Sequence, residues 1–292
     1  MCKLSIIIPV HNRKEITRRC LQCLQKQTDS NFDTIVIDDG STDGTSKMIK
    51  IDFPEIILLQ GEGNLWWTAA TNLGIKKALK KGADLILTLN DDVLIKEDYV
   101  ENFIKAYKEE PRALIGSINL SQEKPARLLS AGNISLNPWT AKCIKRGQIL
   151  RPYSNTFSGL LSSYTLPGRG MLIPRAVFDA IGLFDEKHFP HYAADEDFSL
   201  RAKKAGFDVL IHTQNPVFSP YEPKRTGGKE QTIASFLKSF FILHNPNYLP
   251  VLIRYNIRHH SYKLYIPFFM FLEIARRFFS YFSAKWKKMK NR

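Results

Sequence analysis

Residues 4–89 alternate between short apolar runs and stretches with helical spacing, and this alternation limits the possible folds more than any other feature of the chain. The apolar runs cover residues 4–10, 34–37, 56–59 and 85–89, and the helical stretches between them cover residues 13–27, 45–50 and 68–81. Apolar runs of this length are typical of strands that are buried on both faces of a sheet. Their alternation with helices predicts an α/β fold with a mostly parallel central sheet that is flanked by helices.

The pattern after residue 89 is weaker. Between residues 112 and 167, Gly, Pro, Ser and Asn interrupt short apolar pieces, and we place no element there. Further on, the spacing predicts strands at 170–174 and 209–212 and helices at 176–181 and 195–204. The Pro- and Gly-containing residues 219–229 predict a flexible loop or linker. We therefore expect one folded body at residues 1–220 and an extension at residues 221–292.

The positive charge of the chain is concentrated in that extension. The net charge is +14, and residues 223–292 hold 14 Lys and Arg against two Asp and Glu. A body that is nearly neutral lacks the basic surface of a nucleic-acid-binding protein, so we expect no nucleic-acid partner, although a basic tail that binds nucleic acid is the rival interpretation. A basic and aromatic tail also suits attachment to an acidic surface.

Neither the cysteines nor the N-terminus indicates export. Cys2, Cys20, Cys23 and Cys143 are too few for a disulfide scaffold, and the single CxxC of Cys20 and Cys23 has no second pair to complete a metal site. The apolar stretch at residues 4–10 is short for the apolar part of a signal peptide. We therefore expect a cytoplasmic protein.

Acidic and amide side chains follow the predicted strands where those strands end. Asp38 and Asp39 follow the second strand, and Asn90, Asp91 and Asp92 follow the fourth. In an open parallel sheet these positions meet at one edge, where ligands bind. Carboxylates brought together there repel one another unless a cation or hydrogen-bond donors lie among them. The pattern favours Mg²⁺ or Mn²⁺ holding a phosphate-bearing substrate, whereas ordinary turn and helix-cap chemistry is the alternative.

Taken together and in this order, the motifs resemble those of the family-two glycosyltransferases, inverting enzymes of the GT-A fold. The resemblance covers residues 4–220 and is carried by residues 5–12 (SIIIPVHN), 36–45 (VIDDGSTDGT), 63–64 (GN), 72–75 (NLGI), 90–92 (NDD), 168–173 (GRGMLI) and 194–197 (ADED) with Arg201. Trp66, Trp67 and residues 189–195 are similar to a branch common among bacterial surface-polysaccharide enzymes, often labelled rhamnosyl- or galactosyltransferases. The resemblance implies a nucleotide-binding half at about residues 1–110 and an acceptor-binding half at about residues 111–220.

The resemblance also implies roles for individual residues. Asp92 takes the position of the metal ligand, for Mg²⁺ or Mn²⁺. Asp195 takes that of the catalytic base, with Glu196 and Asp197 as rivals because the usual preceding Glu is Ala194 here. The residues implied in binding a nucleotide-diphosphate sugar donor are Pro9, Val10, Asn12, Asp38 or Asp39, Asn64, Asn72, Asn90, Asp91 and Arg169.

A second set of residues is implied on the acceptor side and around the diphosphate. The acceptor is a glycan or a lipid-linked sugar, and its candidate contacts are Trp66, Trp67, His188, His191 and Tyr192. Each tryptophan either stacks on a sugar ring or fills the core. Lys224, Arg225 and Lys229 either close over the diphosphate or form a solvated loop. The resemblance also implies a histidine near residues 217–219, where many relatives use it to ligate the ion or to touch the diphosphate, and this chain has Ser219 at that position.

The extension itself predicts an interfacial helix. From Leu264 to Trp286 the apolar side chains fall on one stripe, which comprises Phe268, Phe271, Leu272, Ala275, Phe279, Phe282 and Trp286. A basic amphipathic helix rich in Phe suits an anionic membrane surface, so we expect a protein peripheral on the inner face of the cell membrane; packing against the body or a partner is the alternative. The rival enzyme class is a sugar-phosphate nucleotidyltransferase, although its Gly-rich phosphate loop near the N-terminus is missing.

Overall fold

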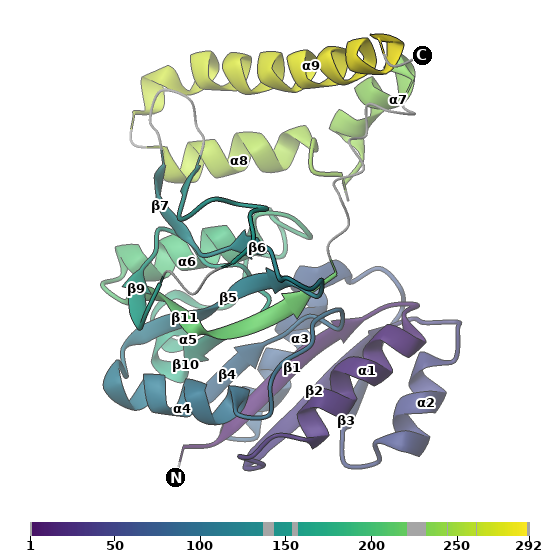
Figure 1. Cartoon of the computed structure of the whole chain (residues 1–292), viewed down its shortest axis with the longest axis vertical. Helices are drawn as coiled ribbons and strands as arrows, with labels where there is room; N and C mark the ends of the chain where they lie inside the picture. The colour runs from purple at the N-terminus through teal and green to yellow at the C-terminus, as the bar shows by residue number, and fades with distance from the viewer. Residues whose placement is uncertain are drawn as a thin grey trace.

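The structure is a computed structural model that describes residues 2–136, 143–153, 157–220, 232–243, 245–260 and 262–290. Its centre is one nine-stranded sheet with the order β3-β2-β1-β4-β10-β5-β11-β9, in which β6 pairs with β5 (Figure 1). The strands are β1 (Leu4–Val10), β2 (Phe32–Asp39), β3 (Ile57–Gly61), β4 (Leu85–Thr88), β5 (Ala113–Ser121), β6 (Leu128–Ser130), β9 (Leu160–Ser162), β10 (Met171–Pro174) and β11 (Asp208–Ser219), and a separate hairpin is formed by β7 (Asn133–Leu136) and β8 (Cys143–Lys145).

Helices cover both faces of the sheet, as the alternating sequence predicts. Within β1, Ile6 and Ile8 face one side and Ile7 faces the other. The first side packs against α1 (Lys14–Gln25), α2 (Thr45–Asp52) and α4 (Tyr99–Glu109), and the second against α3 (Trp66–Lys80), α5 (Arg175–Ile181) and α6 (Ala194–Lys204). Gly74 lets α3 approach the sheet closely, because a Cβ there would lie 2.6 Å from the side chains of Ile7 and Ile37.

The sheet is mostly parallel, and β10, one of its antiparallel strands, brings further residues to the edge where the parallel strands end. β1 pairs in parallel with β2 and β4, and β5 pairs in parallel with β11. Between these two groups, β10 runs antiparallel to both β4 and β5. The chain therefore enters β10 at the edge where the parallel strands end. This direction brings residues 168–170 to the same edge as the loops that follow β1, β2 and β4.

Several regular elements were not predicted from the sequence, and α4 and β5 are the longest of those in the body. α4 and β5 follow the fourth strand, and β5 contains Gly116, Ser117, Asn119 and Ser121, which break its apolar pattern. These polar side chains are nevertheless buried. β11 is also longer than the predicted strand at 209–212, because polar residues continue it to Ser219. Pairing with neighbouring strands, which the local pattern does not report, stabilises both segments.

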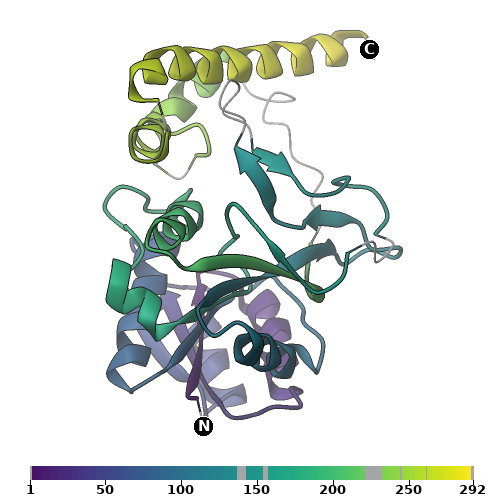
Figure 2. The same cartoon turned by 90° about the vertical axis from the view of Figure 1, so that its left-hand side faces the viewer.

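The extension forms a helical layer on one end of the body (Figures 1 and 2). It consists of α7 (Ile233–Lys238), η1 (Ser239–Phe241), α8 (Leu249–His259), η2 (Lys263–Tyr265) and α9 (Ile266–Lys290). Figure 1 shows α8 between the body and α9. α9 covers the helix predicted from Leu264 to Trp286. Its inner face, with Phe278 and Tyr281, packs against Phe236 and Phe240. In the described part of the chain, no helix is both long and apolar enough to cross a bilayer.

Candidate functional site

A pocket of about 470 Å³ opens at the edge of the sheet where β1, β2 and β4 end. Six separate segments of the chain form its wall, so the lining residues are far apart in sequence. The residues that line it are Pro9, Val10, His11, Arg13, Asp39, Gly63, Trp66, Trp67, Ala70, Asn90, Asp91, Asp92, Arg169, His191 and Tyr192. Most of the predicted donor- and acceptor-binding residues and the predicted metal ligand thus lie around one cavity.

Asp39 organises the turn that leads into α3. Its carboxylate accepts hydrogen bonds from the backbone N–H groups of Gly63 at 2.8 Å, Leu65 at 2.9 Å and Trp66 at 3.1 Å. The neighbouring Asp38 does not line the pocket. Instead its carboxylate accepts hydrogen bonds from the backbone N–H of Ser41, at 2.9 Å, and from the hydroxyl of Ser46. Of the two alternatives for contacting the donor, Asp39 is therefore the one at the cavity.

Asp91 and Asp92 share a cationic neighbour. Arg13 Nη1 lies 3.1 Å from Asp91 Oδ1 and 3.6 Å from Asp92 Oδ2. Thr17 Oγ1 donates to Asp91 Oδ2 at 3.2 Å. Burial raises the pKa of Asp91 to about 6, and the negative charge of Asp92 adds to this effect, while Arg13 opposes it. Arg13 thus supplies part of the positive charge that clustered carboxylates require.

The carboxylate pair fits a hard divalent cation. Asp92 Oδ1 is buried and has no hydrogen-bond partner among the residues that the structure describes. Mg²⁺ is commonly held by one or two carboxylates together with phosphate oxygens of the substrate, and Asp91 and Asp92 could provide those carboxylates. No group of three or more His, Cys, Asp or Glu side chains in the described ranges converges on one point. Ser219, in the position of the histidine found in many relatives, accepts a hydrogen bond from Arg169 Nη1 at 3.2 Å.

The two tryptophans occupy different positions. Trp67 belongs to the wall: its Nε1 donates to Asn90 Oδ1 at 3.1 Å, and its ring packs so tightly on Gly168 that a Cβ there would lie 2.4 Å from it. Trp66 is 39% exposed, and the edge of its ring meets His191 at a centroid distance of 5.9 Å. Of the two, Trp66 has the more accessible ring for a sugar.

Backbone strain is concentrated at this edge of the sheet. Asn12, Trp66 and Ala193 have positive φ angles of 50°, 57° and 64°. The left-handed conformation is unfavourable for residues with a Cβ, and it persists where surrounding contacts enforce it, typically at functional sites. At Trp66 the hydrogen bond from its N–H to Asp39 provides such a contact.

The three consecutive acids at the start of α6 have different partners. Asp195 accepts hydrogen bonds from the backbone N–H groups of Gly168, at 2.8 Å, and of Glu196, at 3.0 Å. Burial raises its pKa, and these hydrogen bonds oppose the effect. Because Gly168 precedes the pocket residue Arg169, Asp195 lies directly behind the pocket wall.

Glu196 and Asp197 differ in the sign of their pKa shifts. Burial raises the pKa of Glu196 to about 7, helped by the charge of Asp195 and opposed by a hydrogen bond from Tyr255. Burial also favours protonation of Asp197, but hydrogen bonds from His259 and Arg201 outweigh it and lower the pKa to about 2. Asp197 is completely buried and does not line the pocket.

Several predicted site residues lie outside the pocket wall and connect segments of the chain. Asn12 Oδ1 accepts from the backbone N–H of Thr42 at 2.8 Å, which ties the loop after β1 to the loop after β2. Asn72 Nδ2 donates to the carbonyl of Phe184 at 2.9 Å. His188 Nδ1 lies 2.8 Å from Asp185 Oδ2. Asn64 is exposed, and Lys224, Arg225 and Lys229 fall outside the described residues.

The sequence analysis assigned no individual role to four residues that line the pocket, His11, Arg13, Gly63 and Ala70. His11 Nδ1 lies 2.6 Å from the carbonyl oxygen of Asp39, and Arg13 pairs with the carboxylates after β4. Their position in the sequence could have indicated a role for His11 and Arg13, because both lie within three residues after the first predicted strand. Ala70 carries no such signal, because only the direction of α3 places it at the cavity.

Comparison with known proteins agrees with this geometry. The model of glycosyl transferase family 2 matches residues 5–182, which is more than half of the chain. The chain belongs to glycosyl transferase family 2. Individual glycosyltransferases match this chain over different fractions of its length. An N-acetylglucosaminyl-diphospho-decaprenol L-rhamnosyltransferase of Mycobacterium tuberculosis is 29% identical over 228 residues, 70% of this chain and 71% of the relative.

Two other relatives are longer than the part that matches this chain. Glycosyltransferase GlyA of Streptococcus pneumoniae is 32% identical over 110 residues, which cover 37% of this chain and 15% of GlyA. An uncharacterized glycosyltransferase of Bacillus subtilis is 25% identical over 260 residues, 73% of this chain and 65% of that protein. The chain therefore spans less than two thirds of the length of these two relatives.

Solved structures of transferases show the same fold. GalNAc-T7, crystallised with UDP, GalNAc and Mn²⁺, superposes with a TM-score of 0.62 at 15% identity over 76% of this chain and 44% of its own. Residues 1–349 of Staphylococcus aureus TarS, in complex with UDP-GlcNAc, superpose with a TM-score of 0.56 at 16% identity over 92% and 79% of the two chains. The predicted GT-A fold is thereby confirmed.

Proposed function

We propose that this family 2 protein is an inverting glycosyltransferase that moves a sugar from a nucleotide-diphosphate sugar to a hydroxyl of a glycan or lipid-linked acceptor. The observation that carries the proposal is the pocket itself. Its wall contains Asp39, Arg169 and Asp92, and one buried oxygen of Asp92 has no hydrogen-bond partner among the described residues. Asp195 lies behind Arg169, because it accepts a hydrogen bond from the backbone N–H of Gly168. This arrangement offers acidic and basic contacts to a nucleoside diphosphate beside a candidate base.

The donor occupies the side of the pocket formed by the ends of β1, β2 and β4. Asp39 lies where a base N–H of the nucleotide is recognised, Asp91 where the ribose or sugar is contacted, and Arg13 and Arg169 carry positive charge for the diphosphate. Asp92 would hold Mg²⁺ or Mn²⁺, and the ion would supply positive charge to neutralise the leaving diphosphate. Trp66, His191 and Tyr192, which also line the pocket, contact the acceptor.

Asp195 acts as the base in a single displacement. Its carboxylate takes the proton from the acceptor hydroxyl, and the hydroxyl oxygen attacks the anomeric carbon as the nucleoside diphosphate leaves with the bonding electron pair. One displacement inverts the configuration at that carbon. Glu196 is the rival base, since its pKa of about 7 suits proton transfer near neutrality. Asp197 is unsuited, because its oxygens already accept hydrogen bonds from Arg201, Arg258 and His259.

The acceptor is carried on a lipid at the inner face of the cell membrane, in the synthesis of a bacterial surface polysaccharide such as O-antigen or capsule. The name of the mycobacterial relative includes a decaprenol carrier, which supports this class of acceptor. α9 supports the location, since Phe268, Phe271, Phe279, Phe282 and Trp286 are half or more exposed on it. The 14 Lys and Arg of residues 223–292 add attraction to anionic lipids, about 1 kcal/mol for each cation near the surface.

The deciding experiment is thermal unfolding of the full chain in the presence of a panel of nucleotide sugars, with and without Mn²⁺. A donor that binds the folded chain raises the unfolding temperature by mass action. We expect one donor to do so in a Mn²⁺-dependent manner, and we expect Asp92→Ala to lose the Mn²⁺ dependence.

Two results would contradict this function. The first is the absence of any donor-dependent shift or turnover across a panel that contains UDP-, GDP-, CMP- and dTDP-sugars. The second is the release of pyrophosphate from a nucleoside triphosphate and a sugar phosphate, which is the reaction of a nucleotidyltransferase.

A further inference from the structure

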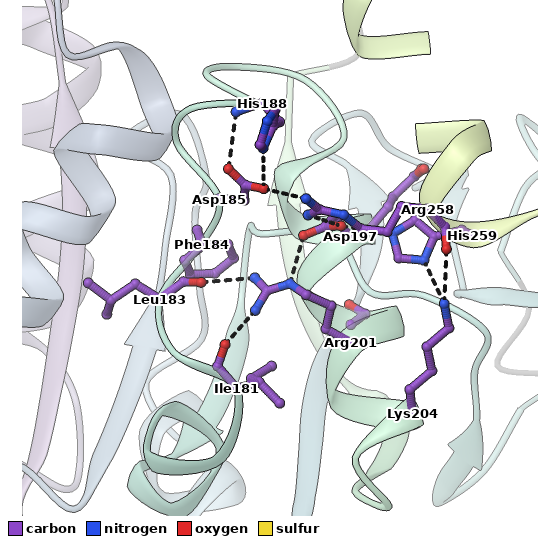
Figure 3. A network of polar contacts seen from close by, with 12 residues as sticks. Ile181, Leu183, Phe184, Asp185, His188, Asp197, Arg201, Lys204, Arg258 and His259 are labelled. Carbon is purple, nitrogen blue, oxygen red and sulfur yellow. Dashed lines mark hydrogen bonds and ion pairs between the residues drawn. The ribbon is translucent and has the colours of Figure 1, made fainter. Parts of the chain in front are cut away.

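The extension makes a charged contact with the catalytic body through α8. Arg258 Nη1 and His259 Nε2 donate to Asp197 Oδ1 at 3.0 and 2.8 Å, while Arg201 donates to the other oxygen of the same carboxylate (Figure 3). Asp197 belongs to the first turn of α6, two residues after the candidate base Asp195. Two side chains of the extension, Arg258 and His259, thus bind the buried carboxylate of Asp197 close to the candidate base.

Arg258 also holds the loop that precedes α6. Its Nη2 lies 2.7 Å from Asp185 Oδ2, and its guanidinium lies 5.3 Å from the ring centroid of Phe189. Asp185 in turn accepts hydrogen bonds from the backbone N–H and the ring of His188 (Figure 3). One guanidinium therefore bridges the loop and α6. Its planar group carries several N–H donors in fixed directions and can bind two carboxylates at once, whereas the ammonium of a lysine has no such fixed arrangement.

The same loop carries pocket residues and is fixed at its other side by α3. Thr68 Oγ1 donates to the carbonyl of Phe189 at 2.6 Å, and the backbone N–H of Thr68 donates to the carbonyl of Pro190 at 3.2 Å. His191 and Tyr192, which line the pocket, follow directly. The position of this part of the wall is thus set jointly by α3 and α8.

His259 contributes as a neutral donor. Its side chain is buried, and burial lowers its pKa. Lys204 Nζ lies 3.5 Å from Nδ1, so the imidazole accepts at Nδ1 and carries its proton at Nε2, which faces Asp197 (Figure 3). Lys204 also donates to the carbonyl of Arg258 at 3.2 Å, which fixes the end of α8.

From these contacts, and resting on the proposed function, we infer that Arg258 and His259 are positioning residues for glycosyl transfer. We call Asp185, Asp197, Arg258 and His259 the α8 clamp. The clamp orients the first turn of α6 and the loop before it, so that Asp195 and the acceptor side of the pocket keep their places relative to the donor. α8 is therefore part of the transferase centre, in addition to linking the body to α9.

The test compares Arg258→Ala with Arg254→Ala in the full chain. Arg254 is exposed on the same helix and serves as the matched control. Amide hydrogen exchange is measured without substrate, and kcat and KM are measured with the nucleotide sugar that the thermal panel selects. We expect Arg258→Ala to increase exchange at residues 183–197 but not in β1 and β2. We also expect kcat to fall ten- to a hundredfold while the KM for the donor stays within threefold, since small misplacements of reacting groups reduce turnover strongly.

A second pair of variants keeps the inference testable if Arg258→Ala does not fold. His259→Gln retains an N–H donor near the position of Nε2 and should keep at least half of the wild-type kcat, whereas His259→Leu removes the donor and should lose kcat in the same way as Arg258→Ala. Arg258→Lys should be intermediate.

The outcomes separate this inference from the proposed function. Three results for Arg258→Ala would each overturn the clamp. The first is unchanged amide exchange at residues 183–197, and the second is an unchanged kcat. The third is an equal increase in exchange across the whole sheet, together with a lower kcat and a higher KM for the donor. A chain that turns over no donor contradicts the function instead, and the exchange measurement then still decides whether α8 orders this segment.

Discussion

At the scale of single residues, three neighbouring acids show how partners decide chemistry. Asp195, Glu196 and Asp197 follow one another at the start of α6, yet each has different partners. Asp195 accepts hydrogen bonds from backbone N–H groups, and Glu196 accepts one from the side chain of Tyr255. Asp197 accepts hydrogen bonds from the side chains of Arg201, Arg258 and His259. Their pKa values shift in different directions for this reason. Two residue-scale predictions follow from the difference.

Asp195→Asn should abolish most turnover and leave donor binding intact. The substitution removes the group that accepts the proton while it keeps the size of the side chain, and Asp195 does not line the donor side of the pocket. We expect kcat to fall by at least a hundredfold, with an unchanged thermal shift from the donor. If Asp195→Asn turns over normally and Glu196→Gln does not, Glu196 is the base.

Glu196→Gln should change how stability depends on pH. The pKa of Glu196 is raised in the folded state from its usual 4.5 to about 7, so its contribution to stability is full below about pH 4.5 and is lost as the pH rises through 7. Between pH 5 and pH 8 the wild type should lose about 2 kcal/mol of unfolding free energy through this group. The Glu196→Gln variant should not show this loss, because glutamine does not ionise. Urea unfolding at both pH values measures the difference, and identical pH dependence in variant and wild type would disprove it.

At the scale of elements, the site depends on close approach between α3 and the start of β10. The ring of Trp67 lies against Gly168, where any Cβ would overlap it, and the indole N–H holds Asn90. Because β10 is antiparallel to its neighbours, Gly168 and Arg169 arrive at the edge where the parallel strands end. Helix and strand together therefore set the shape of the wall.

Gly168→Ala should test this contact. The added methyl group lies 2.4 Å from the Trp67 ring, so either the ring or the strand must shift. We expect a loss of about 1–3 kcal/mol in unfolding free energy, together with weaker donor binding. A double-mutant cycle with Trp67→Phe provides the control: the smaller ring should relieve the clash, so that the double variant is more stable than the sum of the single effects. Strict additivity would show that the contact is not the cause.

At the scale of the whole molecule, the extension has two faces with different partners. The inner face of α9 packs against α7 and η1 through Phe278 and Tyr281, while α8 holds α6 through the clamp. The outer face of α9 presents large aromatic side chains, and Figure 2 shows this helix at the end of the molecule furthest from the N-terminus. In our proposal the outer face meets the membrane while α8 contacts the transferase centre.

Replacing Phe271 and Phe279 together by Ser should weaken binding to vesicles of anionic phospholipid by at least tenfold. These side chains are 67% and 76% exposed, and burying a Phe contributes about 1.5–3 kcal/mol. Ile51→Ser, which removes an apolar side chain that is 65% exposed on α2, is the matched control and should bind like the wild type. Equal vesicle binding by the double variant in a sedimentation assay would show that α9 does not dock on lipid.

The sequence by itself determined the alternation of strands and helices, the acids at the strand ends and the apolar stripe of α9. Each of these is a local pattern, and residues a few positions apart are enough to define it. It did not reveal α4 or β5, since the polar residues within β5 are stabilised by pairing with strands far away in the chain. Nor did it reveal the inner face of α9, where Phe278 and Tyr281 pack against Phe236 and Phe240.

Only the tertiary structure decided which polar residues share the pocket. It placed Asp39 but not Asp38 at the cavity, and it added Arg13 to the wall. It also gave Asp195 and Asp197 different partners, those of Asp197 being the residues of the α8 clamp and Arg201. Neighbouring residues in such pairs look alike in sequence, because their roles depend on the direction of a side chain and on the partner it meets. The partner of Asp197 lies 61 residues further along the chain in Arg258, and only folding brings a charge from that distance to within 3.0 Å.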